Sequence, residues 1–98
     1  MKFALLGQIR PDLTGDNWPA GIEGLIAEEQ ELAAKYYADG LVERAWSMAD
    51  RPGAVAIYNV TDRKELDRLL GQFPLFKAGY VETQIIELKS YDGFDADR

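Results

Sequence analysis

Residues 21–40 read GIEGLIAEEQELAAKYYADG, and the rest of the chain is organised around this stretch. Its apolar residues recur at i, i+3 and i+4 spacings and form one stripe: Ile22, Leu25, Ile26, Leu32, Ala33 and Tyr36. Gly40 is the expected end of the helix, because glycine readily adopts the backbone conformation that closes one. The sequence therefore predicts one long amphipathic helix with a single covered face.

Glu29 lies inside this apolar stripe, one turn after Leu25 and one turn before Leu32. Its neighbours Glu28 and Glu31 are predicted to point into water. A carboxylate on a core-facing stripe is costly unless it has a partner, lies at the edge, or faces a polar cavity. Two interpretations stay open, namely a base in a cavity and a helix-edge carboxylate paired with Lys or Arg.

The remaining segments complete a β-α-β-β-α-β order. In chain order they are a strand at 2–9, a loop at 10–19 whose Asp16 or Asn17 is expected to cap the long helix, strands at 41–49 and 54–60, a helix from 61 or 62 to about 71, an apolar loop at 73–76 and a strand at 80–88. This order predicts an α+β, ferredoxin-like fold, with two helices on one face of a four-stranded antiparallel sheet. We expect one domain over residues 1–98, with a folded core at 1–90 and a polar tail at 91–98.

Strand alternation predicts which side chains share a sheet face. In the second strand, Arg44 and Trp46 are expected to share the pocket-facing side with Val42 and Met48; in the third, Asn59 is expected on the inward side. The opposite face is predicted to be apolar, with Ala45, Ala56, Tyr58, Val60 and Ile86. Two such faces could pack together, so we expect a homodimer that forms a dimeric α+β barrel.

Composition excludes several classes of function. The net charge is −6 and the 11 basic residues are scattered, which argues against nucleic acid or anionic membrane as a partner. Without cysteine or histidine there is no disulfide, thiolate zinc site or Ser-His triad, and no carboxylate cluster has the spacing of a metal site. No apolar run is long enough for a signal peptide or a membrane span, so a cytoplasmic protein is expected.

Several stretches of the second half resemble the muconolactone delta-isomerase family. They are Trp46, the strand AVAIYNV at 54–60, the helix positions Glu65-Leu66 and Leu69-Leu70, and the loop FPLF at 73–76. In that family a Trp-bearing strand, a "vSIFDV" strand, a "dELheiL" helix and a "lPLFpy" loop follow in the same order. The first half is similar more loosely, with a helical Glu eleven residues before a terminal glycine, as Glu29 stands before Gly40.

The resemblance implies a cofactor-free isomerase of aromatic catabolism that shifts a proton within an unsaturated lactone, from (+)-muconolactone to the 3-oxoadipate enol-lactone. It also implies dimeric barrels that assemble further into decamers. Family members often have an Arg directly after the strand Trp and a His before it, where this chain has Ser47 and Ala45. Both departures remove a candidate cation for a substrate carboxylate.

A proton shift next to a carbonyl needs a base and a group that holds the developing enolate. We expect Glu29 to be the base, since a mostly apolar cavity brings carboxylate basicity nearer to neutral pH. Arg44 is expected to pair with Glu29 or a substrate carboxylate, the alternative being a surface or interface ion pair. Tyr36 is the candidate donor to an enolate oxygen, or else a core residue with a wet tip.

The candidate substrate-binding residues are mostly aromatic. Trp46, Phe73 and Phe76 are expected to wall the pocket, with Met48 beside them, although aromatic residues at such spacings are usually core. Trp18 is expected to fold over a pocket or a partner, and Asn59 to donate a hydrogen bond or be a satisfied buried amide.

Two other functions remain open at the level of the sequence. One is a cofactor-independent oxygenase or cyclase, since similar barrels do such work. The other is a non-catalytic module that binds a small molecule or forms oligomers, which the absence of His and the presence of Ser47 favour. Glu29 on the apolar stripe favours the isomerase.

Overall fold

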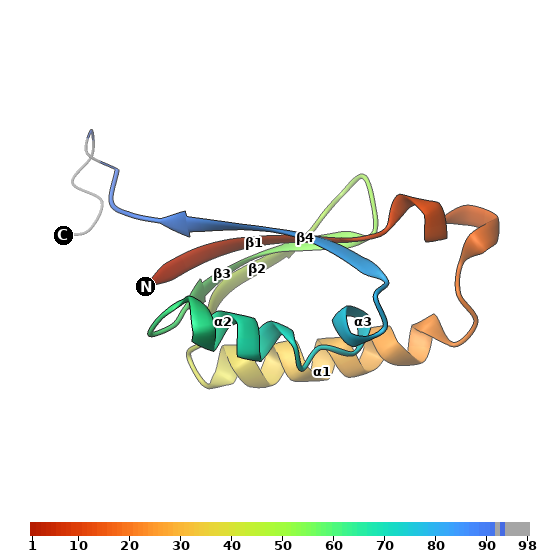
Figure 1. The fold of residues 1–98 in the computed structure, drawn as a ribbon, viewed down its shortest axis with the longest axis horizontal. Coiled ribbons are helices and arrows are strands. Elements are labelled where there is room, and N and C mark those ends of the chain that lie inside the picture. The colour runs from red at the N-terminus through yellow and green to blue at the C-terminus, as the bar shows by residue number, and fades with distance from the viewer. Residues whose placement is uncertain (92, 94–98) are drawn as a thin grey trace.

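The computed structural model describes residues 1–91 and 93 and has two layers, a sheet and the helices that cover one of its faces (Figure 1). Its elements are β1 (Lys2–Ile9), the 3-10 helices η1 (Pro11–Leu13) and η2 (Gly15–Asn17), α1 (Ile22–Ala38), β2 (Val42–Ser47), β3 (Gly53–Asn59), α2 (Arg63–Leu70), α3 (Pro74–Lys77) and β4 (Val81–Leu88). The sheet has the order β2-β3-β1-β4 and every pairing is antiparallel. The predicted α+β, ferredoxin-like fold is confirmed.

Local signals set the ends of both long helices. Gly40, with φ of +78°, follows the last turn of α1 as predicted. The prediction that Asp16 or Asn17 caps the start of α1 is wrong, because both lie in η2 and Gly21 occupies the cap position. At the start of α2, the side chain of Asp62 accepts a hydrogen bond from the Glu65 amide at 2.9 Å, as expected of a capping residue.

A β-bulge in β2 decides which side chains face the helices. Val42 pairs with Tyr58, whereas Arg44 pairs with Ile57 two residues later, so the register shifts by one position between them. The extra residue reverses the alternation. Val42 is therefore buried under the helices, while Arg44 and Trp46 lie on the opposite face, and the prediction that all three share one face is wrong.

The two sheet faces are also exchanged relative to the sequence prediction. Ala56, Tyr58 and Val60 are buried in the core under the helices, and Ala45 lines a cavity on that same side. Of the residues predicted for the uncovered face, Ile86 does lie there, with 42% of its surface exposed. Alternation reveals that two faces exist but not which one the helices cover, because β3 has apolar residues on both.

The uncovered sheet face exposes several large apolar side chains. Trp46 is 49% exposed and Leu88 is 38% exposed, and both lie on this face with Ile86. In residues 1–91 and 93, no helix is both long and apolar enough to cross a membrane. The predicted polar tail at 91–98 falls mostly outside the described residues.

Candidate functional site

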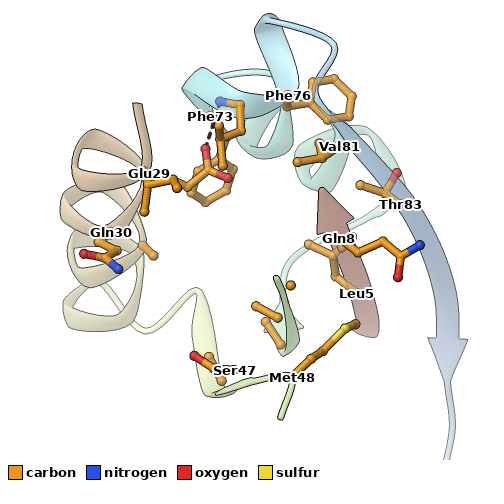
Figure 2. Close-up of a pocket in the computed structure, with 18 of the residues that line it drawn as sticks. Leu5, Gln8, Glu29, Gln30, Ser47, Met48, Phe73, Phe76, Val81 and Thr83 are labelled. Carbon is orange, nitrogen blue, oxygen red and sulfur yellow. Dashed lines mark hydrogen bonds between the residues drawn. The ribbon is translucent and has the colours of Figure 1, made fainter. Parts of the chain in front are cut away.

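A cavity of about 660 Å³ opens between α1, α3 and the covered face of the sheet. Its wall is mainly apolar, with residues such as Leu5, Ile9, Ile26, Ala33, Leu70 and Val81. The polar side chains on it come from different elements: Gln8, Glu29, Gln30, Tyr37, Ser47, Arg51, Tyr58 and Thr83. Figure 2 shows Glu29 projecting from α1, with Gln8 and Thr83 on the opposite wall. A cavity of this size and composition suits a small organic ligand.

Glu29 faces this cavity, as predicted, and is half-buried. Its Oε1 accepts a hydrogen bond of 3.1 Å from the backbone N–H of Leu75, drawn as the dashed line in Figure 2. That amide is available because it belongs to the first turn of α3, where no helical carbonyl can pair with it. No Lys or Arg of the described chain forms an ion pair with Glu29, so the interpretation as a paired helix-edge carboxylate is not supported.

The surroundings of Glu29 make it a stronger base than an ordinary carboxylate. Burial raises its pKa above the usual value, and the hydrogen bond from the Leu75 amide offsets part of that rise. Loss of solvation disfavours the charged form, which is the physical cause of the higher basicity. The arrangement therefore supplies a carboxylate able to take up and return a proton.

Tyr58 is a cavity residue that the sequence analysis missed, because it was assigned to the uncovered face. Only 3% of its surface is exposed, and it lines the same cavity as Glu29. Burial raises the pKa of its hydroxyl well above the usual value, and the nearby Tyr36 hydroxyl and Glu29 carboxylate raise it further. Tyr58 therefore keeps its proton and can act only as a neutral donor or acceptor.

Three of the other predicted site residues line the cavity. Phe73 is buried, Phe76 is 43% exposed, and Met48 lies at the end of the β2–β3 hairpin. Figure 2 shows Phe73 and Phe76 on the α3 side and Met48 on the sheet side. The two aromatic rings and the thioether provide apolar surface for a planar ligand.

Tyr36 and Trp18 lie outside the cavity. The Tyr36 hydroxyl donates a 3.2 Å hydrogen bond to the carbonyl of Leu69, and its ring packs edge-to-face on Phe73 at 5.5 Å between centroids. Trp18 packs against a small cluster around Ile22, and its Nε1 donates to Glu23 at 3.2 Å. Both are packing residues in this structure, so the expected contact of Tyr36 with a substrate oxygen is not supported.

Arg44, Trp46 and Asn59 lie on the uncovered sheet face, and this corrects their predicted orientation. The guanidinium carbon of Arg44 stands 5.3 Å from the centre of the Trp46 ring, a cation–π contact on the surface of the sheet. Asn59 is exposed on the same face. The cause for Arg44 and Trp46 is the bulge in β2, and for Asn59 it is the exchanged assignment of faces.

The β2–β3 turn forms the far rim of the cavity. Arg51 is the one cationic side chain among the described lining residues, and it is bound to the Asp50 carboxylate at 2.8 Å and to Gln8 at 3.3 Å. Gly53 packs closely here, since a Cβ atom on it would stand 2.5 Å from the carbonyl oxygen of Gly7. The residues described include no group of three or more His, Cys, Asp or Glu placed to hold a metal ion.

Comparison with known proteins now identifies the family. Residues 8–93 match the family model described as muconolactone delta-isomerase. The chain belongs to this family. A crystal structure of muconolactone isomerase superimposes with a TM-score of 0.81 at 25% sequence identity, covering 97% of this chain and 95% of that one. Comparison with curated proteins gives no match.

Two further solved structures show how widely the fold is used. A 5-chloro-2-hydroxyhydroquinone dehydrochlorinase from Burkholderia phenoliruptrix, in complex with 2,5-dihydroxybenzoquinone, has a TM-score of 0.68 at 16% identity, covering 97% of this chain and all (100%) of that one. An antibiotic biosynthesis monooxygenase has a TM-score of 0.55 at 14% identity, covering 93% of this chain and 99% of that one. At these identities the likeness concerns the fold alone.

Proposed function

We propose that this protein is a cofactor-free isomerase that shifts a proton within a small unsaturated lactone or a related organic acid. The observation that carries the proposal is Glu29, a half-buried carboxylate with a raised pKa and no cationic partner in the described chain, at the wall of a mostly apolar cavity. Membership of the muconolactone delta-isomerase family supports the same chemistry. A role in aromatic-compound catabolism and a cytoplasmic location stay predictions from the sequence.

In the proposed mechanism Glu29 acts twice. Its carboxylate removes a proton from the carbon next to the conjugated lactone system, and the electron pair of the broken C–H bond moves into that system to give an enolate. The protonated Glu29 then returns the proton to another carbon of the same system, so that the double bond has moved and the enzyme is unchanged. The hydrogen bond from the Leu75 amide fixes the carboxylate between the two steps.

The apolar wall contributes by excluding water from the enolate. Figure 2 shows Phe73 next to Glu29 and Phe76 farther away, near Val81, and a planar ligand packed against Phe73 would present its edge to the carboxylate. A dry site strengthens the electrostatic interactions between the protein and the charge that develops on the substrate. Arg51 at the rim is the candidate to attract a substrate carboxylate, after exchange of its contact with Asp50.

We further propose that the protein functions as a homodimer joined through the uncovered sheet face. Trp46, Ile86 and Leu88 form an exposed apolar surface there. Burying it against a second copy would remove this surface from water and give the dimeric α+β barrel. Ile86→Lys places a charge at this surface and is expected to shift the protein to a monomer in size-exclusion chromatography; an unchanged elution volume would contradict the dimer.

The catalytic proposal is tested by exchange of solvent deuterium into muconolactone, followed by nuclear magnetic resonance. The wild-type protein is expected to exchange deuterium and form the enol-lactone, and Glu29→Gln to reduce the rate at least 100-fold, the order expected for loss of a general base. Glu31→Gln, on the exposed side of the same helix, is the matched control and should leave the rate unchanged.

Two results would decide against the isomerase. Equal exchange rates for Glu29→Gln and the wild type would remove Glu29 from the mechanism. Tight binding of the lactone with no exchange by the wild type would instead indicate a binding module that keeps the cavity without the chemistry.

A further inference from the structure

The side chain of Tyr58 brings a hydroxyl group to the covered side of the sheet, beneath α1. Tyr58 belongs to β3, a central strand of the sheet, and pairs with Phe3 of β1 and Val42 of β2. Pairing on both sides holds the strand, and burial of all but 3% of the residue holds the side chain. The hydroxyl therefore has a fixed position. A hydrogen-bond donor that stabilises charge developing on a substrate needs such a position.

This hydroxyl has no hydrogen-bond partner in the part of the chain that the structure describes, residues 1–91 and 93. In that same part, every fully buried side-chain nitrogen or oxygen has a partner. The Tyr58 oxygen is thus not sealed in the core, and the residue is one of those that line the cavity. A buried tyrosine normally satisfies its hydroxyl within the protein, as Tyr36 does with the Leu69 carbonyl.

Glu29 lies within electrostatic range of this hydroxyl, since its charge is one of the three causes of the raised pKa of Tyr58. A bound molecule in the cavity would thus meet a carboxylate from α1 and a neutral O–H donor from β3. The raised pKa also means that Tyr58 does not give up its proton to Glu29 or to water. The pair combines a base with a donor that stays protonated.

We propose that Tyr58 is a second catalytic residue, whose hydroxyl donates a hydrogen bond to the substrate oxygen on which negative charge develops when Glu29 removes the proton. This assignment rests on the proposed isomerase function. The enolate oxygen accepts the hydrogen bond, Tyr58 keeps its proton throughout, and the single proton that moves is the one Glu29 takes and returns. The interaction strengthens as charge builds up, which is the requirement for faster turnover.

The first test compares two buried tyrosines. Tyr58→Phe is expected to lower kcat for lactone exchange 10- to 100-fold with less than a threefold change in KM, because the donor acts on the enolate more than on the ground state. Tyr36→Phe is the matched control and should leave kcat unchanged, since that hydroxyl is used inside the core. Tyr58→Phe should also leave the midpoint of thermal unfolding unchanged or raise it, because no hydrogen bond among the described residues is lost.

The second test does not depend on turnover and uses para-nitrophenol, whose phenolate resembles an enolate and is followed by its colour. The comparison is between Glu29→Gln and the double variant Glu29→Gln/Tyr58→Phe. In each protein the affinity for the phenolate is divided by the affinity for the neutral phenol. We expect this ratio to be at least tenfold higher in Glu29→Gln, which keeps Tyr58, than in the double variant. Equal ratios in the two proteins, or no bound phenolate in either, would overturn the role of Tyr58.

These tests separate the two proposals. If the wild type does not exchange the lactone but the phenolate responds to Tyr58, the isomerase proposal fails and the catalytic role of Tyr58 fails with it, while its hydroxyl is still shown to donate to an oxyanion in the cavity. If the lactone exchanges and Tyr58→Phe changes neither kcat nor the phenolate ratio, the donor assignment fails and Glu29 remains the base.

Discussion

Replacement of Glu29 by Gln should stabilise the folded protein at neutral pH and have little effect in acid. The pKa of Glu29 is raised on folding, chiefly by burial, so the folded chain holds this proton more tightly than the unfolded chain. The stability of the wild type therefore falls as pH rises from the ordinary carboxyl range through the raised pKa, and stays lower above it. Gln does not ionise, so the free energy of unfolding of Glu29→Gln should exceed that of the wild type by an amount that grows over this pH range.

The hydrogen bond from Leu75 predicts how far the Gln and Ala variants differ in free energy of unfolding, and this difference does not depend on pH. Gln keeps an acceptor oxygen for this 3.1 Å contact, whereas Glu29→Ala leaves the amide of a buried residue without one. An unsatisfied buried donor costs about 1–3 kcal/mol, and about 1.5 is appropriate because Glu29 is only half-buried. Alanine recovers about 0.4 kcal/mol through its helix propensity, so the Gln variant should exceed the Ala variant by about 1 kcal/mol.

Urea unfolding followed by tryptophan fluorescence measures both quantities, at fixed protein concentration and at about pH 4 and about pH 8. Glu31→Gln, an exposed position on the same helix, is the control for a change of net charge. The reasoning is refuted if Glu29→Gln is less stable than the wild type at the higher pH. It is equally refuted if Glu29→Gln and the wild type differ in free energy of unfolding by the same amount at both pH values. Equal stability of the Gln and Ala variants would also refute it.

Three further substitutions test the packing of the core and of the β2–β3 turn. Tyr36→Phe removes the hydrogen bond to the Leu69 carbonyl and should lower the free energy of unfolding by about 1 kcal/mol, seen as a thermal midpoint lower by about 4–8 °C; an unchanged midpoint would contradict that contact. Gly53→Ala places a Cβ against a backbone oxygen and should cost about 1–3 kcal/mol in urea unfolding, whereas a neutral effect would mean that the strand end can yield. Leu66→Ala truncates a fully buried side chain of α2 and leaves a cavity, so it should lower the free energy of unfolding by about 2–5 kcal/mol in the same assay. A decrease below about 1 kcal/mol would contradict a place for Leu66 in the core.

Part of the candidate site could be predicted because it depends on local periodicity. Glu29 stands out in the sequence as a carboxylate inside an apolar stripe, and the structure brings it to the cavity wall. Phe73, Phe76 and Met48 also line the cavity as expected. The Leu75 amide that binds Glu29 was not predicted, because the two residues are 46 positions apart and no local signal connects them.

The residues placed on the wrong face have two causes. Arg44 and Trp46 follow a bulge, and a single inserted residue reverses every later side chain of that strand without leaving a mark in the sequence. Asn59 and Tyr58 are neighbours on β3, so exchanging the two faces exchanged their roles and hid the hydroxyl that lines the cavity. Both faces of β3 carry apolar residues, so the pattern could not indicate which one the helices cover.

The sequence by itself determined the four strands, the two long helices, their order and the fold class, because helix periodicity, strand alternation and turn chemistry are properties of neighbouring residues. The loop predicted at 73–76 is wrong, since these residues begin the short helix α3 (Pro74–Lys77). The sequence also determined that position 29 is an acid on an apolar stripe. Only the tertiary structure decided which sheet face is covered, which side chains enclose the cavity, and that Tyr58, whose hydroxyl has no partner among the described residues, is one of them. Those outcomes depend on the packing of α1 and α3 over the sheet, a contact between segments far apart in the chain, which local sequence patterns do not encode.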